Sequence, residues 1–159
     1  MIAPVTRRVS WTYLLLVTTL ALTGMAQMPI AKRYHIADVP GLAWLGDFYL
    51  THKLHYLAAA GLLFLTSYLV TRWFMEWRQD WELTPLGWAR AVVLLALVGT
   101  GGVRVLKNLP DVSFTPTPTM LVDWTHLGLA FVLGGLALAR PALRAAYIRR
   151  VARSASARR

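Results

Sequence analysis

Four histidines are the side chains of this sequence best suited to bind a metal: His35, His52, His55 and His126. The 159-residue chain has no cysteine, which excludes disulfides, thiolate zinc sites, iron–sulfur ligation and covalent C-x-x-C-H attachment of heme by this chain. Any metal or heme must therefore be held by histidine, methionine or carboxylate. What the histidines can do depends on the elements that carry them.

The composition is typical of a membrane protein. Hydrophobic residues make up 57% of the chain and charged residues 15%, and the mean hydropathy is +0.48, which is too apolar for a soluble domain of this size. The formal charge of +10 could indicate nucleic acid, but the basic residues stand at the edges of apolar runs and not on one amphipathic face. We therefore expect membrane lipid, and no nucleic acid, around the chain.

Four apolar stretches can each cross a bilayer as a helix, which takes about 20 residues because every backbone group must be hydrogen-bonded within the segment. The predicted fold is an all-α integral membrane four-helix bundle, residues 1–140, followed by a basic cytoplasmic tail, residues 141–159. We expect the tail to be a frayed helix that meets anionic headgroups, with a specific partner site as the alternative. The loop before the fourth span contains Pro110, Pro116 and Pro118 and is predicted to be non-helical. The spans are expected at about residues 11–30, 54–72, 88–106 and 120–139.

Lysine and arginine predict the orientation, because they gather on the cytoplasmic side of membrane proteins. Of the 17 in this chain, 12 lie on the face that both termini would share. Both termini are therefore assigned to the cytoplasm, in a multi-pass protein of a bacterial-type inner (cytoplasmic) membrane. For the first span, a cleaved secretory signal is the alternative, since Arg7 and Arg8 precede an apolar stretch that ends in small residues. The five cations of the opposite face are Lys32, Arg33, Lys53, Arg104 and Lys107.

This orientation places all four histidines on the outer side. His52 and His55 stand where the second span begins, and His126 lies inside the fourth span. Counting back from Arg72 to His55 gives 17 residues, and from Arg140 to His126 gives 14. At a helical rise of about 1.5 Å per residue, the two imidazoles would lie at depths in the membrane that differ by no more than about one helical turn.

Ionisable side chains inside a span are costly and tend to mark function. Two imidazoles at matched depth on different helices suit axial ligation of one heme iron between them. The simpler alternative makes His55 an interfacial residue and His126 an interhelical hydrogen-bonding residue. His35 lies in a loop and is expected to be a surface residue.

Cations near the outer histidines are candidate contacts for a bound group. Arg104 and Lys107 could pair with heme propionates or a quinone headgroup, or they could be the snorkelling cap of the third span. Lys53, next to His52, is a further candidate for a proton or quinone site. Small residues in the third span would let a neighbouring helix or a macrocycle approach closely; these are Gly99, Gly101 and Gly102.

The order of these elements resembles a known family. His55 opens the second span, and the fourth span contains His126 in the stretch WTHLG at residues 124–128. Residues 100–110 read TGGVRVLKNLP. Together these features are similar to the four-helix gamma (cytochrome b) subunits of respiratory formate dehydrogenases and related hydrogenase and ferredoxin-linked modules. The resemblance covers most of the chain through short motifs.

The resemblance implies an outer heme b held by one histidine of the second helix and one of the fourth, here His55 and His126. The inner heme of that family uses a first-helix histidine and another farther along the fourth helix. This chain has no histidine in its first span, and the fourth-helix position falls near Arg140. We therefore expect a single outer heme b, with a second heme on His35 and His52 as the alternative.

The resemblance further implies an electron-transfer subunit of a membrane oxidoreductase complex, and not a stand-alone enzyme. Electrons would pass between an extracytoplasmic iron–sulfur or multiheme cytochrome subunit and the quinone pool. The alternative is a heme-free membrane anchor or assembly subunit of a larger complex, for which apolar helices and a basic tail are sufficient. A small transporter is weakened by the lack of a buried carboxylate or an obvious inverted repeat in the spans.

Overall fold

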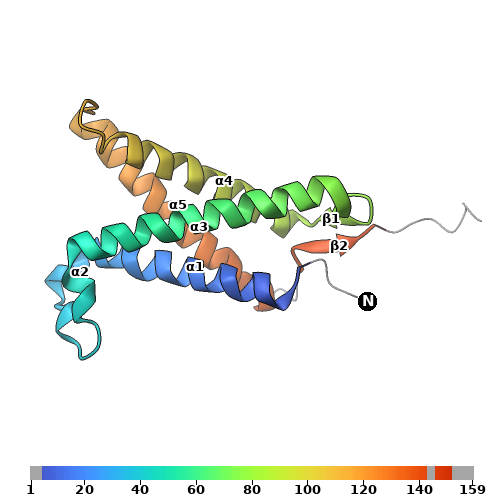
Figure 1. Cartoon of the computed structure of the whole chain (residues 1–159), viewed down its shortest axis with the longest axis horizontal. Coiled ribbons are helices and arrows are strands. Elements are labelled where there is room, and N and C mark those ends of the chain that lie inside the picture. Colours follow the sequence, from blue (N-terminus) through green and yellow to red (C-terminus); the bar gives the residue numbers. More distant parts are fainter. Residues whose placement is uncertain (1–4, 143–145, 152–159) are drawn as a thin grey trace, which may run out of the picture. The chain divides into compact units, whose positions relative to one another are not determined.

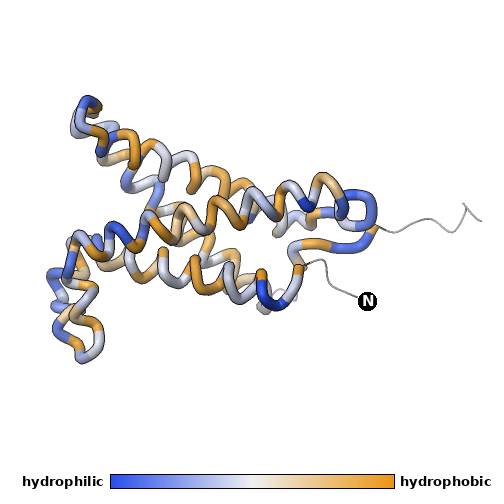
Figure 2. The backbone as a smooth tube through the Cα atoms, in the orientation of Figure 1, coloured by the Kyte–Doolittle hydropathy of each residue, from blue (hydrophilic) through white to orange (hydrophobic). Residues whose placement is uncertain are grey.

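The computed structural model describes residues 5–142 and 146–151. Four of its helices are long and apolar enough to cross a membrane: α1 (Arg7–Ala26), α3 (Phe48–Arg72), α4 (Pro85–Leu106) and α5 (Pro116–Ala142). Apolar residues follow these helices, and hydrophilic residues gather at their ends and in the turns (Figure 2). The predicted all-α membrane fold is thereby confirmed. The chain divides into two compact units, Met1–Trp77 and Arg78–Arg159, and each is described by itself.

The first unit is a hairpin of α1 and α3, which pack side by side (Figure 1). Asp47 caps α3, because its side chain accepts a hydrogen bond from the backbone N–H of Leu50. Gly61 of α3 meets Leu16 of α1, where an added Cβ would lie 3.0 Å from the leucine side chain. The loop between the two helices contains three short helical turns: α2 (Pro29–Arg33), η1 (Ile36–Asp38) and η2 (Ala43–Gly46).

The helix ends of this unit differ from the predicted spans. α1 ends at Ala26, before the predicted residue 30, and α3 begins at Phe48, before the predicted residue 54. Hydropathy detects only the part of a helix that lies in hydrocarbon, whereas α3 continues to its capping aspartate. His52 and His55 consequently lie about one and two turns inside α3 and not at its start. Beyond Arg72, α3 runs into a π-helical turn, η3 (Trp73–Trp77).

The second unit is a hairpin of α4 and α5. Thr84 caps α4, since its hydroxyl oxygen accepts from the backbone N–H of Gly87. Pro116 and Pro118 lie in the first turn of α5, although the loop was predicted to include both. That prediction was wrong because the first N–H groups of a helix need no intrahelical acceptor, so proline is tolerated there.

A two-stranded ribbon pairs the segment before α4 with the segment after α5. Strand β1 (Trp81–Leu83) pairs antiparallel with β2 (Ile148–Arg150), and Arg149 forms an ion pair with Glu82 at 2.6 Å. The prediction of a frayed helix is therefore wrong for residues 148–150, while residues 143–145 and 152–159 lie outside the described part of the chain. Gly87 fits closely against this segment, because an added Cβ would overlap the carbonyl oxygen of Tyr147.

Candidate functional site

His55 of α3 contacts α1 through a threonine. Its Nδ1 lies 2.9 Å from Oγ1 of Thr23, a side chain that is fully buried. The same hydroxyl lies 2.7 Å from the backbone carbonyl oxygen of Thr19, one turn earlier in α1. Gly24 follows Thr23, and a Cβ added there would lie 3.3 Å from Cε1 of His55. A glycine at this position therefore lets the imidazole lie close to the backbone of α1.

These contacts select one tautomer of His55. A hydroxyl has one proton to donate, and a carbonyl oxygen can only accept. Both contacts of Thr23 are hydrogen bonds at once only if its hydroxyl donates to the Thr19 carbonyl and Nδ1–H of His55 donates to Oγ1. The lone pair of the ring is then on Nε2, which is the nitrogen that can ligate a metal.

His126 of α5 repeats this arrangement against α4. Its Nδ1 lies 2.8 Å from Oγ1 of Thr100, whose hydroxyl lies 2.9 Å from the carbonyl oxygen of Ala96, one turn earlier. A Cβ added to Gly101 would lie 3.4 Å from Cε1 of His126. By the same argument, Nδ1 carries the proton and Nε2 carries the lone pair.

The two hairpins share a second contact, about one turn nearer the loop that joins the helices of each. Four positions after the threonine, the first hairpin has Gln27 and the second has Arg104. Three positions before the histidine, the first hairpin has His52 and the second has Asp123. Nδ1 of His52 lies 3.3 Å from Oε1 of Gln27, and Nε of Arg104 lies 3.1 Å from Oδ1 of Asp123. Each hairpin thus combines Thr-Gly-x-x-polar on its first helix with polar-x-x-His on its second. We call this combination the Thr-Gly/His repeat.

The second contact is neutral in one hairpin and charged in the other. Lys107 joins Arg104 on Asp123, with Nζ 2.9 and 2.8 Å from the two carboxylate oxygens. Two cations therefore share one carboxylate, which leaves one net positive charge. In the first hairpin, the amide of Gln27 donates to the backbone carbonyl of Thr23 at 3.1 Å.

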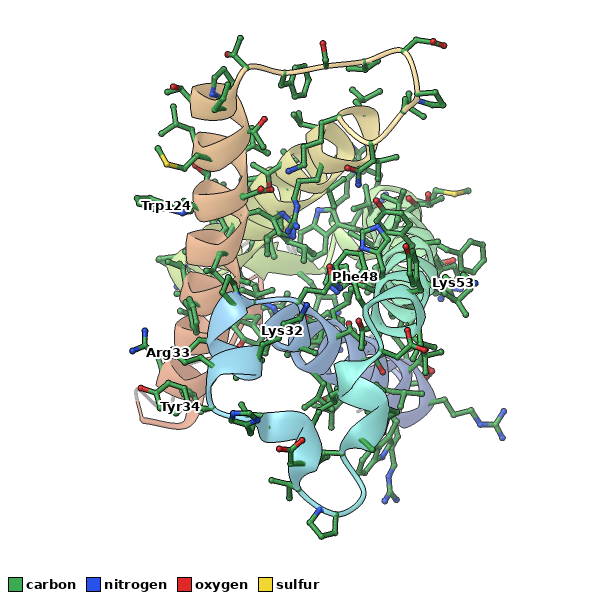
Figure 3. All side chains as sticks on the ribbon, turned by 90° about the vertical axis from the view of Figure 1, so that its left-hand side faces the viewer. Lys32, Arg33, Tyr34, Phe48, Lys53 and Trp124 are labelled. Carbon is green, nitrogen blue, oxygen red and sulfur yellow. The ribbon has the colours of Figure 1, made fainter. Side chains whose placement is uncertain are left out.

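The remaining predicted site residues lie elsewhere. His35 is a surface residue, as expected: its side chain is 77% exposed, and its Nδ1 lies 3.1 Å from a carboxylate oxygen of Asp38. Lys53 is exposed and projects from α3 (Figure 3), whereas the neighbouring His52 is bonded to α1 through Gln27. Within residues 5–142 and 146–151, no group of three or more histidines, cysteines or carboxylates lies close enough to hold a metal ion.

Two residues of the first hairpin, Thr23 and Gln27, were missed by sequence reasoning, and Gly101 was expected to allow the close approach of a helix or a macrocycle and not of His126. A signal was present, because the dipeptide Thr-Gly occurs at residues 23–24 and again at residues 100–101. Each is followed by the histidine that it contacts, after 32 residues in one hairpin and 26 in the other. The two copies run in the same chain direction, so this is a direct repeat and not an inverted one.

The resemblance to cytochrome b subunits depends partly on the stretch around His126. Trp124, two residues earlier, is 68% exposed and points away from α4 (Figure 3). The histidine of the same stretch turns toward Thr100.

Comparison with family models gives no match, and comparisons with curated proteins and solved structures give no significant match.

Proposed function

We propose that this chain is a membrane-embedded b-type cytochrome subunit in which His55 and His126 are the axial ligands of one heme b. The observation that carries the proposal is the matching environment of the two imidazoles, one in each hairpin. In both, Nδ1 lies within hydrogen-bond distance of a threonine hydroxyl that is itself bonded to a backbone carbonyl, which favours the tautomer with the proton on Nδ1 and the lone pair on Nε2. A hydrogen bond from the non-ligating nitrogen is the usual device that orients a metal-binding histidine and fixes its tautomer.

The two sites also occupy matching positions within their own hairpins, which supports a common role for the two histidines. Thr23 lies 16 residues after Arg7, the start of α1, and Thr100 lies 15 residues after Pro85, the start of α4.

The donor set fits heme b, because two neutral imidazoles with their Nδ1 protons engaged provide two Nε2 ligands. When bound, the heme supplies one-electron transfer, while the protein orients the ligands and sets their electron-donating strength. Arg104 and Lys107 would bring net positive charge to heme propionates or a quinone headgroup, provided that Asp123 shares them. His52 and Lys53 would be the corresponding polar residues on the first hairpin.

The proposed role is electron transfer within a complex of a bacterial-type inner membrane. Such a chain would connect an extracytoplasmic iron–sulfur or multiheme cytochrome subunit to quinone. It would not act as a stand-alone enzyme. Both termini would lie in the cytoplasm, as the distribution of lysine and arginine indicates.

A reduced-minus-oxidised spectrum of the purified full chain tests this proposal. We expect one low-spin heme b per chain, quantified as the pyridine complex. His55→Ala and His126→Ala should each abolish the low-spin spectrum, and the control His35→Ala, in an exposed loop, should retain it. A folded protein that binds no heme would favour a heme-free anchor, and low-spin heme retained in His126→Ala would refute the ligand assignment.

A further inference from the structure

The threonine hydroxyls of the Thr-Gly/His repeat have one more polar contact than a helical threonine commonly needs. A helical threonine commonly donates its hydroxyl proton to the carbonyl of the preceding turn, and this alone satisfies it. Thr66 of α3 does so, with its Oγ1 at 2.7 Å from the carbonyl oxygen of Leu62. Thr23 and Thr100 make the same bond and, in addition, lie 2.9 and 2.8 Å from Nδ1 of a histidine of the neighbouring helix.

The result in each hairpin is a short hydrogen-bonded chain from imidazole to hydroxyl to backbone carbonyl. Successive hydrogen bonds polarise one another, so a hydroxyl that is donating to a carbonyl is a stronger acceptor for Nδ1–H. A stronger bond at Nδ1 raises the electron density on the opposite nitrogen, Nε2, and makes the imidazole a more basic ligand. Hydrocarbon offers no water to substitute for the threonine.

We infer that Thr23 and Thr100 are positioning residues that fix the Nδ1–H tautomer of His55 and His126 and thereby lower the reduction potential of the heme iron. The tautomer is a property of the polypeptide alone, while the effect on potential rests on the proposed function. A more basic ligand stabilises ferric over ferrous iron. Removal of either hydroxyl therefore shifts the potential upward.

Redox titration of the full-length protein in lipid nanodiscs tests the effect on the iron. Thr23→Val and Thr100→Val keep the side-chain shape and remove the acceptor, so each raises the midpoint potential. Thr23→Ser and Thr100→Ser keep the hydroxyl and restore the potential of the unsubstituted protein. Thr66→Val is the matched control, because it removes a hydroxyl bonded to its own helix in the same way, and it leaves the potential unchanged.

A second readout does not depend on heme. The ring nitrogen shifts of ¹⁵N-histidine in heme-depleted protein distinguish the two tautomers, with His55→Gln and His126→Gln used to assign the signals. Nδ1–H at both positions supports the inference, even if the unsubstituted protein takes up no heme and the proposed function fails. Nε2–H at either position overturns it. Heme-loaded valine variants whose potential is unchanged also overturn it, and if those variants do not fold, the tautomer measurement still decides.

Discussion

The two hairpins of this chain hold their histidines through the same kind of contact. They differ at the next contact, which lies about one helical turn nearer the loop that joins the two helices of each hairpin. At the histidine, both use a neutral threonine hydroxyl and a neighbouring glycine. At the next contact, the first hairpin has an amide bonded to an imidazole, and the second has a carboxylate bonded to two cations. The comparison separates the contact that both halves share, an imidazole beside a threonine hydroxyl, from the contact that differs between them.

The neutral and charged contacts are expected to contribute differently to the stability of their hairpins. A neutral hydrogen bond contributes about 0.5–1.5 kcal/mol to stability, whereas bonds to charged groups contribute about 1.5–3 kcal/mol. Loss of Asp123 would leave both Arg104 and Lys107 without their carboxylate, and the Lys107 side chain is only 15% exposed. The charged contact is therefore expected to stabilise the loop end of its hairpin more strongly than the neutral contact does.

The largest expected effect tests whether the two halves are equivalent as ligand sites. His55→Ala and His126→Ala should lower heme affinity to a similar extent, by at least about 100-fold, since loss of a ligand should exceed the 10–100-fold typical for loss of a ligand's hydrogen-bond partner. Exogenous imidazole should restore low-spin heme in both variants, as measured by absorption spectra. Loss in only one variant would contradict the equivalence.

A second prediction concerns the contrast between the charged and neutral contacts. Asp123→Ala should lower the free energy of unfolding by about 1.5–3 kcal/mol, and Gln27→Ala by about 0.5–1.5 kcal/mol. Denaturant titration in one detergent, followed by circular dichroism, compares the two variants directly. The contrast would be refuted if the Gln27 variant were the less stable.

The glycines offer a matched test of close packing. Gly24→Ala and Gly101→Ala each place a methyl group 3.3 or 3.4 Å from Cε1 of the facing histidine, so the ring must shift by a few tenths of an ångström. The low-spin absorption band should weaken in both variants. Gly99→Ala is the control, because an added Cβ there meets no atom within 4 Å. An equal loss in the control would show that the effect is not specific to the ring.

The smallest effect is expected at the ribbon of the second unit. Glu82 and Arg149 are 45% and 67% exposed in their side chains, and exposed ion pairs contribute about 0–1 kcal/mol. Glu82→Ala should therefore leave the unfolding midpoint and the heme spectrum nearly unchanged. A large loss of heme would mean that this ribbon, and not only the Thr-Gly/His repeat, supports the second site.

Sequence reasoning reached the four spans but not all of their ends. A run of apolar residues shows where lipid surrounds a helix, yet α3 continues out to Asp47 and α5 to Pro116, where capping and first-turn chemistry decide the start. It also missed the ribbon, because β1 and β2 lie far apart in the chain and neither is a strongly patterned strand. The histidines were identified as candidates, but their contacts with Thr23 and Thr100 were not.

What the sequence by itself determined is the class of protein and the types of ligand that it can offer. Four long apolar runs must become helices, because hydrocarbon leaves no other way to satisfy their backbone groups, and a chain without cysteine leaves histidine as its main metal ligand. Only the tertiary structure decided that Nδ1 of His55 and of His126 lies beside a threonine hydroxyl. That contact depends on how the two helices of each hairpin are rotated against each other, which brings together side chains 32 and 26 residues apart.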